Sequence, residues 1–114
     1  PSASLLFYGA KEKLQIRLKV KLERVGVAER DEMWARTPSY SRECYQVTTA
    51  PGSDVRSPEA TQFDAHQADG GRENFAPIRA RVDELEWLYL SAKRHRRAHY
   101  IFTESGVKAR WVVP

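Results

Sequence analysis

The chain has 114 residues, enough for one domain and too few for two. A hydrophobic fraction of 41% excludes a wholly disordered chain, and no apolar run approaches the ~20 residues that span a bilayer, so we expect no membrane partner. The net charge of +4 is mild, which fits a phosphate-bearing cofactor better than a long nucleic-acid track. Cys44 is the only cysteine, so no disulfide can form within the chain, and a reducing cytoplasmic location is predicted.

The first part of the chain predicts a β-hairpin. Residues 4–8 form a short apolar run, and the Gly9-Ala10-Lys11-Glu12 segment makes a turn. From Lys13 to Val25 apolar and polar residues alternate with a period of two, which is typical of a long, half-buried strand. The apolar positions are Leu14, Ile16, Leu18, Val20 and Leu22, and the polar positions are Gln15, Arg17, Lys19, Lys21 and Glu23.

Residues 29–47 predict a pair of short helices. Glu29 lies early and Arg36 late in the first of them, an order that complements the helix dipole, and Thr37-Pro38 ends it. The apolar contacts of the pair are expected from Met33, Trp34, Tyr40, Cys44 and Val47. Cys44 is interpreted as a packing residue, because no histidine accompanies it.

Residues 48–74 are rich in Pro, Gly, Ser, Asp and Gln and show no periodicity, so we expect one long loop that is either functional or partly disordered. The remainder predicts three strands, at residues 75–90, 96–103 and 107–113, joined by short turns as an antiparallel meander. The alternation changes phase near Asp83-Glu84, which indicates a β-bulge in the first of the three. Trp87 and Trp111 are interpreted as core residues.

The fold class predicted from these elements is mainly β (α+β), a barrel of antiparallel strands with a short helical pair. The order of features resembles the pyridoxamine 5'-phosphate oxidase-like family, and it is closer to the broad FMN-binding branch than to the true vitamin oxidases. The matching segments are Leu14-Gln15-Ile16-Arg17-Leu18, Trp34-Ala35-Arg36-Thr37-Pro38-Ser39-Tyr40-Ser41, Ala50-Pro51-Gly52, Val82-Asp83-Glu84-Leu85-Glu86-Trp87-Leu88-Tyr89-Leu90, His95-Arg96-Arg97-Ala98 and Ala109-Arg110-Trp111-Val112-Val113-Pro114.

That resemblance implies a split barrel that forms a homodimer, with FMN held at the dimer interface. It assigns cofactor contacts to Gln15, Arg97 and Trp87, with Leu88 taking the place of Trp87 if the register is shifted by one residue. A Gln amide can both donate to a flavin carbonyl and accept from a ring N–H. An Arg beside the ring would stabilise the negative charge that appears on reduction.

By the same resemblance the substrate site includes Ser41, Lys93 and His95, while the family's Tyr and Arg in the first helix are replaced by Met33 and Thr37. A pocket without those two side chains has lost most of its hold on a vitamin phosphate, so the substrate and the catalytic residues stay unknown.

Family members also carry an N-terminal portion that clamps the FMN phosphate, and the chain, which begins at Pro1, has no such portion. Residues 1–114 are therefore interpreted as one FMN-binding split-barrel domain, either a piece of a longer protein or a reduced relative that holds FMN weakly.

The function predicted is thus an FMN-binding, oxidoreductase-like homodimer acting on an unknown small molecule. The alternative is a non-catalytic split-barrel binding module, or a basic β-barrel that binds nucleic acid. Alternate strand residues point to opposite faces, so Arg97 and His99 should lie together and Arg96 apart, which divides the basic cluster and disfavours nucleic acid. No metal site is predicted, because the histidines are scattered.

Overall fold

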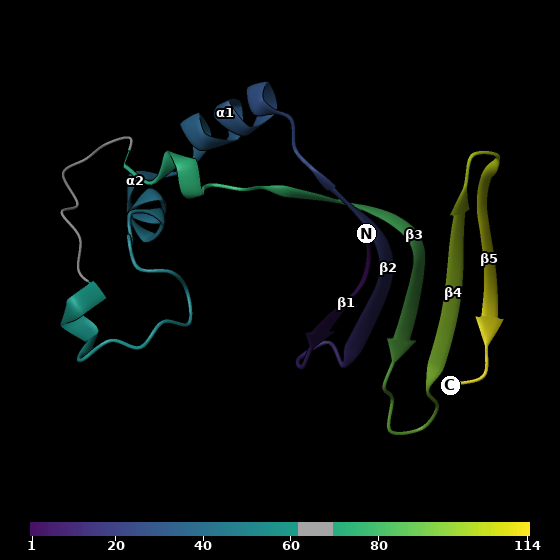
Figure 1. The fold of residues 1–114 in the computed structure, drawn as a ribbon. Helices are drawn as coiled ribbons and strands as arrows, with labels where there is room; N and C mark the ends of the chain where they lie inside the picture. The colour runs from purple at the N-terminus through teal and green to yellow at the C-terminus, as the bar shows by residue number, and fades with distance from the viewer. Residues whose placement is uncertain (62–69) are drawn as a thin grey trace. The chain divides into compact units, whose positions relative to one another are not determined.

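The computed structural model describes residues 1–61 and 70–114, which form two compact units (Figure 1). Pro1–Glu23 and Ile78–Pro114 make up the first, which we call the sheet unit, and Arg24–Pro77 make up the second, the helical unit. Within the described residues no helix is long and apolar enough to cross a membrane. The predicted loop at residues 48–74 lies partly outside the described residues.

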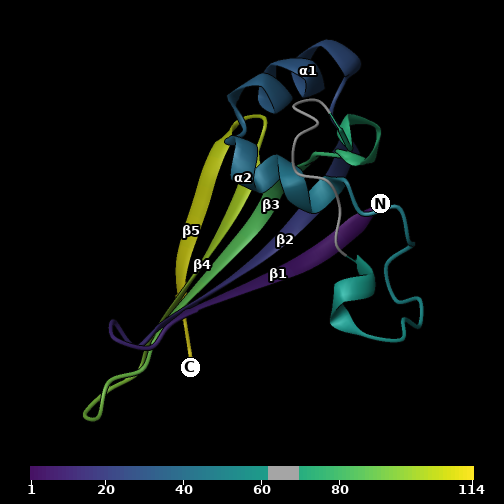
Figure 2. The ribbon, with the colours of Figure 1, turned by 90° about the vertical axis from the view of Figure 1, so that its left-hand side faces the viewer.

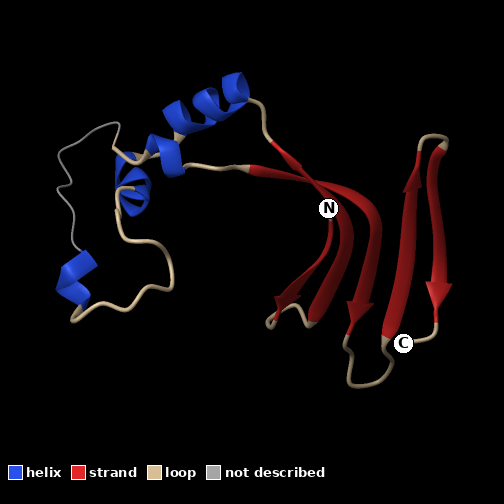
Figure 3. Cartoon of the chain, viewed as in Figure 1, coloured by secondary structure: helices blue, strands red, loops and turns tan. Residues whose placement is uncertain are grey.

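The sheet unit is a single five-stranded antiparallel sheet whose strands follow one another in chain order (Figure 3). The strands are β1 (Ser2–Gly9), β2 (Leu14–Arg24), β3 (Ile78–Tyr89), β4 (Arg96–Thr103) and β5 (Gly106–Val112). In Figure 2 the five strands fan out from the end that carries the β1–β2 and β3–β4 turns, as expected of a twisted sheet. All five predicted strand regions are confirmed, as are the first hairpin and the three-stranded meander.

The helical unit contains short helices joined by irregular segments. They are α1 (Val27–Arg36), α2 (Ser39–Arg42), and three 3₁₀ turns at Glu43–Tyr45, Pro58–Thr61 and Arg72–Asn74. The predicted helical pair is confirmed, although α1 begins two residues earlier than expected and the second helix ends at Tyr45. Thr37 and Pro38 separate the two because Thr37 is extended, as a residue before proline should be.

The registers of the hairpins fix which side chains share a row across the sheet. Tyr8 lies opposite Gln15 between β1 and β2, and Arg97 lies opposite both Leu88 of β3 and Val112 of β5. Between β2 and β3, the Leu90 N–H donates to the Lys13 carbonyl at 2.8 Å.

Two backbone hydrogen bonds join the chain segments of β2 and β3 near their two ends, and the β3 segment between them is one residue longer than the β2 segment. The first of these joins Lys13 to Leu90, and the second joins the Val25 N–H to the Pro77 carbonyl at 3.3 Å. Twelve residue steps on β2 thus face thirteen on β3. An extra residue on one strand is what defines a β-bulge, in agreement with the phase change near Asp83-Glu84.

One face of the sheet is apolar, but it is only partly covered. Val20 and Ala98 are buried, with 1% and 5% of their surface exposed. Trp111, by contrast, is 72% exposed, so its interpretation as a core residue is wrong. The reason is its place on β5, the last strand of the sheet, where no further strand lies beside it. Trp87, more centrally placed on β3, is half-buried.

The helical unit has an aromatic core. Trp34 is 3% exposed, and its ring packs against those of Tyr45 and Phe75 with centroid separations of 5.8 and 5.3 Å. The expectation that Tyr40 and Cys44 supply apolar contacts is wrong, because both are exposed. The four-residue α2 is too short to turn every apolar side chain toward one core.

Candidate functional site

Gln15 and Arg97 lie in the same row of one face of the sheet. Since the Leu90 N–H bonds to the Lys13 carbonyl, Gln15 lies opposite Leu88, and Leu88 lies opposite Arg97. Side chains of residues directly opposite each other share a face. The two polar residues that the family resemblance assigned to a cofactor are therefore separated by one leucine, and we call Gln15, Leu88 and Arg97 the central row.

The Arg97 guanidinium is held by two contacts. Its Nη2 donates to Glu86 Oε2 at 2.6 Å, and its Nη1 donates to the Val113 carbonyl at 3.4 Å. Its Nε is buried and, among the described residues, has no hydrogen-bond partner. A buried donor without a partner is costly, and Nη1 and Nη2 are the nitrogens of this guanidinium that make hydrogen bonds.

The Gln15 amide is half-buried and makes no hydrogen bond to the part of the chain that the structure describes. Both its carbonyl oxygen and its amide nitrogen are thus available. An unengaged amide offers two donors and an acceptor. A free amide of this kind can form paired hydrogen bonds with a planar heterocycle that carries alternating donors and acceptors.

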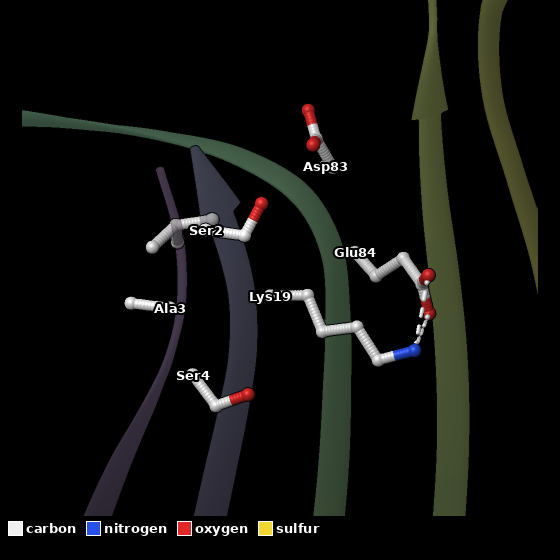
Figure 4. A pocket seen from close by; sticks show the side chains of 7 residues that line it. Ser2, Ala3, Ser4, Lys19, Asp83 and Glu84 are labelled. Atoms are coloured by element: carbon white, nitrogen blue, oxygen red, sulfur yellow. Dashed lines mark hydrogen bonds and ion pairs between the residues drawn. The ribbon is translucent and has the colours of Figure 1, made fainter. Parts of the chain in front are cut away.

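In the neighbouring rows of the same face, basic side chains of one strand lie next to acidic side chains of the adjacent strand. Arg17 of β2 pairs with Glu86 at 3.4 Å. Lys19 pairs with Glu84 at 3.2 Å, and Figure 4 shows these two side chains pointing toward each other. On the other side of β3, the His99 ring Nε2 lies 2.8 Å from Glu84 Oε2. Glu84 is therefore flanked by basic side chains on both neighbouring strands, as is Glu86 between Arg17 and Arg97.

This arrangement lowers the pKa of Glu84. The hydrogen bond from His99 is the largest cause, followed by that from Lys19, and both favour the ionised carboxylate. The face nevertheless retains an excess of positive charge. The cations in these rows are Arg17, Lys19, Arg97 and Arg110, against the carboxylates Glu84 and Glu86. The face is electrostatically suited to an anionic ligand.

Trp87 lies on the opposite face from the central row. It is paired with Ala98, and its ring packs edge-on against Trp111 with centroids 5.9 Å apart. The structure does not bring Trp87 together with Gln15 and Arg97. Leu88 occupies the position between them, which is the arrangement that a one-residue register shift implies.

Arg96 and Arg97 point to opposite faces, as the strand period predicts. The Arg96 guanidinium lies over the Tyr89 ring, 6.0 Å from its centroid, whereas Arg97 reaches Glu86. Arg97 and His99 contact the two carboxylates of β3 on the same face. The basic cluster is thus divided by the sheet, which confirms that prediction.

The three residues assigned to a substrate lie in different units. Lys93 and His95 are exposed in the turn between β3 and β4 of the sheet unit. Ser41 is half-buried on α2 of the helical unit, where its N–H donates to the Pro38 carbonyl at 3.0 Å.

Among the described residues, each unit contains a pocket. In the sheet unit, a pocket of about 370 Å³ is lined by side chains of β1, β2 and β3, including Ser4, Lys19 and Glu84 (Figure 4). In the helical unit, a pocket of about 920 Å³ is lined by residues 44–51 with Glu73 and Asn74. Neither includes a member of the central row, which lies on an open face.

Sequence reasoning missed Glu84 and Glu86. The signal was present, because acidic residues two apart on β3 face basic residues two apart on both neighbouring strands. Only the strand register, however, shows that these residues meet.

No protein-family model matches the chain, and no curated protein matches it in sequence. Solved structures do match it, and two of them are the following. A pyridoxamine 5'-phosphate oxidase-related, FMN-binding protein from Nostoc punctiforme superposes on the whole chain with a TM-score of 0.83 at 15% identity. PhzG from Burkholderia lata, solved in complex with tetrahydrophenazine-1-carboxylic acid, superposes on 99% of it with a TM-score of 0.70 at 20% identity.

The chain therefore has the fold of pyridoxamine 5'-phosphate oxidase-related proteins, a mainly β split-barrel fold, as the ordered motifs predicted. It spans 63% of the length of the first of these structures and 59% of the second.

Proposed function

We propose that the chain is a flavin-binding protein that holds FMN against the central row, with Gln15 and Arg97 as its polar contacts. The observation that carries the proposal is the register that places both on one face with Leu88 between them. The FMN-binding protein from Nostoc punctiforme, which shares the fold, supports the choice of cofactor.

The residues of this face fit the chemistry of FMN. The isoalloxazine ring is amphipathic, with apolar faces and a polar edge. The central row offers one unengaged amide, the apolar side chain of Leu88 and one guanidinium with an unpartnered buried donor. Tyr8, opposite Gln15, and Val112, opposite Arg97, add apolar side chains at its two ends. The excess of cations on the same face would favour the phosphate group. Leu88 takes the place that the family resemblance first gave to Trp87.

FMN, when bound, would supply the capacity to accept and release a hydride or an electron pair. Gln15 would orient the ring by donating to a carbonyl and accepting from an N–H. Arg97 would stabilise negative charge on the ring, and its planar donors would fix the ring edge in one direction. Leu88 would exclude water from the area between them.

The assembly proposed is a homodimer with the flavin at its interface. Several large apolar side chains of the sheet unit are exposed, namely Leu6, Phe7, Tyr8, Phe102, Val107 and Trp111. Of these, Leu6 and Tyr8 lie on the face of the central row, where exposed apolar side chains are candidates for a protein contact. Ser41, Lys93 and His95 are proposed as contacts of a small-molecule substrate.

A titration tests the proposal. FMN fluorescence and visible absorbance are recorded as the 114-residue chain is added, up to millimolar concentrations. We expect the flavin bands to shift and the fluorescence to be quenched, with weak affinity, since the family resemblance assigns the phosphate clamp to an N-terminal portion outside these 114 residues. Unchanged flavin spectra, combined with salt-dependent retardation of an oligonucleotide, would favour the nucleic-acid alternative.

A further inference from the structure

We infer that Glu86 is a positioning residue, which fixes the Arg97 guanidinium in the orientation required at the central row. The inference rests on the proposed FMN site but makes a separate claim about a residue that the family resemblance does not assign. Glu86 contacts Arg97 from the adjacent strand at 2.6 Å, the shortest side-chain hydrogen bond among the described residues of this face.

Glu86 acts on Arg97 diagonally across the strand pair. Its own partner in register is His99, and Arg97 lies two residues along β4, opposite Leu88. Together with the Val113 carbonyl beside β5, the carboxylate therefore holds the guanidinium from both neighbouring strands.

Both oxygens of Glu86 are engaged. Oε2 accepts from Arg97, and Oε1 accepts from Arg17 at 3.4 Å on the opposite side of β3. The carboxylate is only 20% exposed, compared with 50% for Arg17. A carboxylate held from two sides cannot rotate freely, so the direction of its bond to Arg97 is fixed.

The buried Nε of Arg97 gives this arrangement an observable consequence. Because Nε is covered and has no partner in the described residues, its proton is protected by burial alone, and burial depends on the guanidinium staying where Glu86 holds it. Release of the guanidinium would expose Nε to water.

Glu84 provides a matched control. It is on the same strand and the same face, one row away, and it is also paired with a basic residue on each side, Lys19 and His99. Glu84→Gln and Glu86→Gln make the same change of net charge on this face. Any difference between them reports the contact with Arg97 rather than the general electrostatic field.

The first measurement needs no cofactor. The solvent exchange of the Arg97 Nε proton is followed by nitrogen-15 NMR in the wild type, Glu84→Gln and Glu86→Gln. We expect exchange to accelerate about tenfold in Glu86→Gln only, the factor that corresponds to loss of one charge-assisted hydrogen bond. Equal exchange rates in Glu84→Gln and Glu86→Gln would overturn the inference.

Glu86→Asp is a second variant for the exchange measurement, to be used if Glu86→Gln does not fold. It preserves the charge but shortens the side chain by one CH₂ group, so it should not span the same distance to Arg97. We expect faster Nε exchange than in the wild type, while wild-type exchange in a folded Glu86→Asp protein would contradict the positioning role.

The second measurement separates this inference from the proposed function. In the FMN titration, Glu86→Gln should bind about tenfold more weakly than Glu84→Gln, and most of the gap should persist at high salt, because a partly buried ion pair is screened much less than exposed charges. If the wild type binds FMN and the two variants bind equally, the inference fails and the FMN site stands. If the wild type binds no FMN, the proposed function fails, and the NMR result alone decides the role of Glu86.

Discussion

Glu84 of β3 and His99 of β4 are joined by a 2.8 Å hydrogen bond on the polar face of the sheet, while Lys19 reaches the same carboxylate from β2. Three adjacent strands are thus connected through one side chain. The same pattern recurs one row away, where Glu86 lies between Arg17 and Arg97. On this face, Glu84 and Glu86 of β3 thus link β3 to β2 and β4 through hydrogen bonds and ion pairs.

The Glu84 contacts predict how stability depends on pH. The pKa of Glu84 is lowered in the folded chain, chiefly by the hydrogen bond from His99. A carboxyl group with a lowered folded-state pKa stabilises the fold above its unfolded-state pKa of about 4.3, and this contribution is lost as pH falls through the folded value. Glu84→Gln should therefore have a lower urea midpoint than the wild type at pH 7.

That difference should narrow as the pH falls below 4, where the wild-type carboxylate becomes protonated. Glu104→Gln, in the exposed turn between β4 and β5, is the control and should match the wild type throughout. A constant deficit of Glu84→Gln at every pH would show that its effect is not electrostatic.

Gly71 is predicted to be essential to the helical unit. Its φ of 83° is in the left-handed region, and a Cβ there would overlap the backbone carbonyl of Tyr45. Gly52 has the same φ, but a Cβ there would meet open space. Gly52→Ala should thus cost only the backbone strain, about 1–2 kcal/mol, whereas Gly71→Ala should cost about 3 kcal/mol or more because backbone must also move.

Urea denaturation of both variants, followed by the fluorescence of the buried Trp34 and its neighbours, measures the difference. Equal destabilisation by the two substitutions would mean that Tyr45 does not approach Gly71 as closely as the structure shows.

The exposed apolar side chains predict self-association. We expect light scattering to show a dimer at micromolar concentrations when FMN is present, because Leu6 and Tyr8, on the face of the central row, would otherwise expose more than half of their surfaces to water. Leu6→Gln should weaken the dimer, whereas Val55→Gln, an exposed apolar position of the helical unit, serves as the control. A clean monomer with FMN bound would contradict a shared flavin site.

Much of the fold could be predicted from the sequence because strand periodicity is local. The alternation from Lys13 to Val25 requires only neighbouring residues, and it located β2 to within a residue. The phase change near Asp83 is equally local, and an extra residue in β3 agrees with it. The exposure of Trp111 was not predictable in this way, since it depends on which strand ends the sheet.

The site could be predicted only in part, for the same physical reason. Arg97 and His99 share a face by strand periodicity alone, and the sequence predicted this. Their carboxylate partners depend on the register between strands, which is set by the length of the β3–β4 turn and by the β2–β3 pairing. A shift of one residue would exchange Leu88 for Trp87 in the central row.

The comparison of Arg97→Lys with Arg96→Lys tests the central claim most directly. The two arginines are neighbours in sequence but lie on opposite faces of β4, and each substitution retains the charge while removing the planar donors. We expect Arg97→Lys to bind FMN at least about tenfold more weakly, since it loses one or two charge-assisted bonds worth about 1.5–3 kcal/mol each, and to lower the flavin reduction potential. Arg96→Lys should remain close to the wild type in both. Equal effects of the two substitutions, or no effect of Arg97→Lys, would contradict a flavin site at the central row.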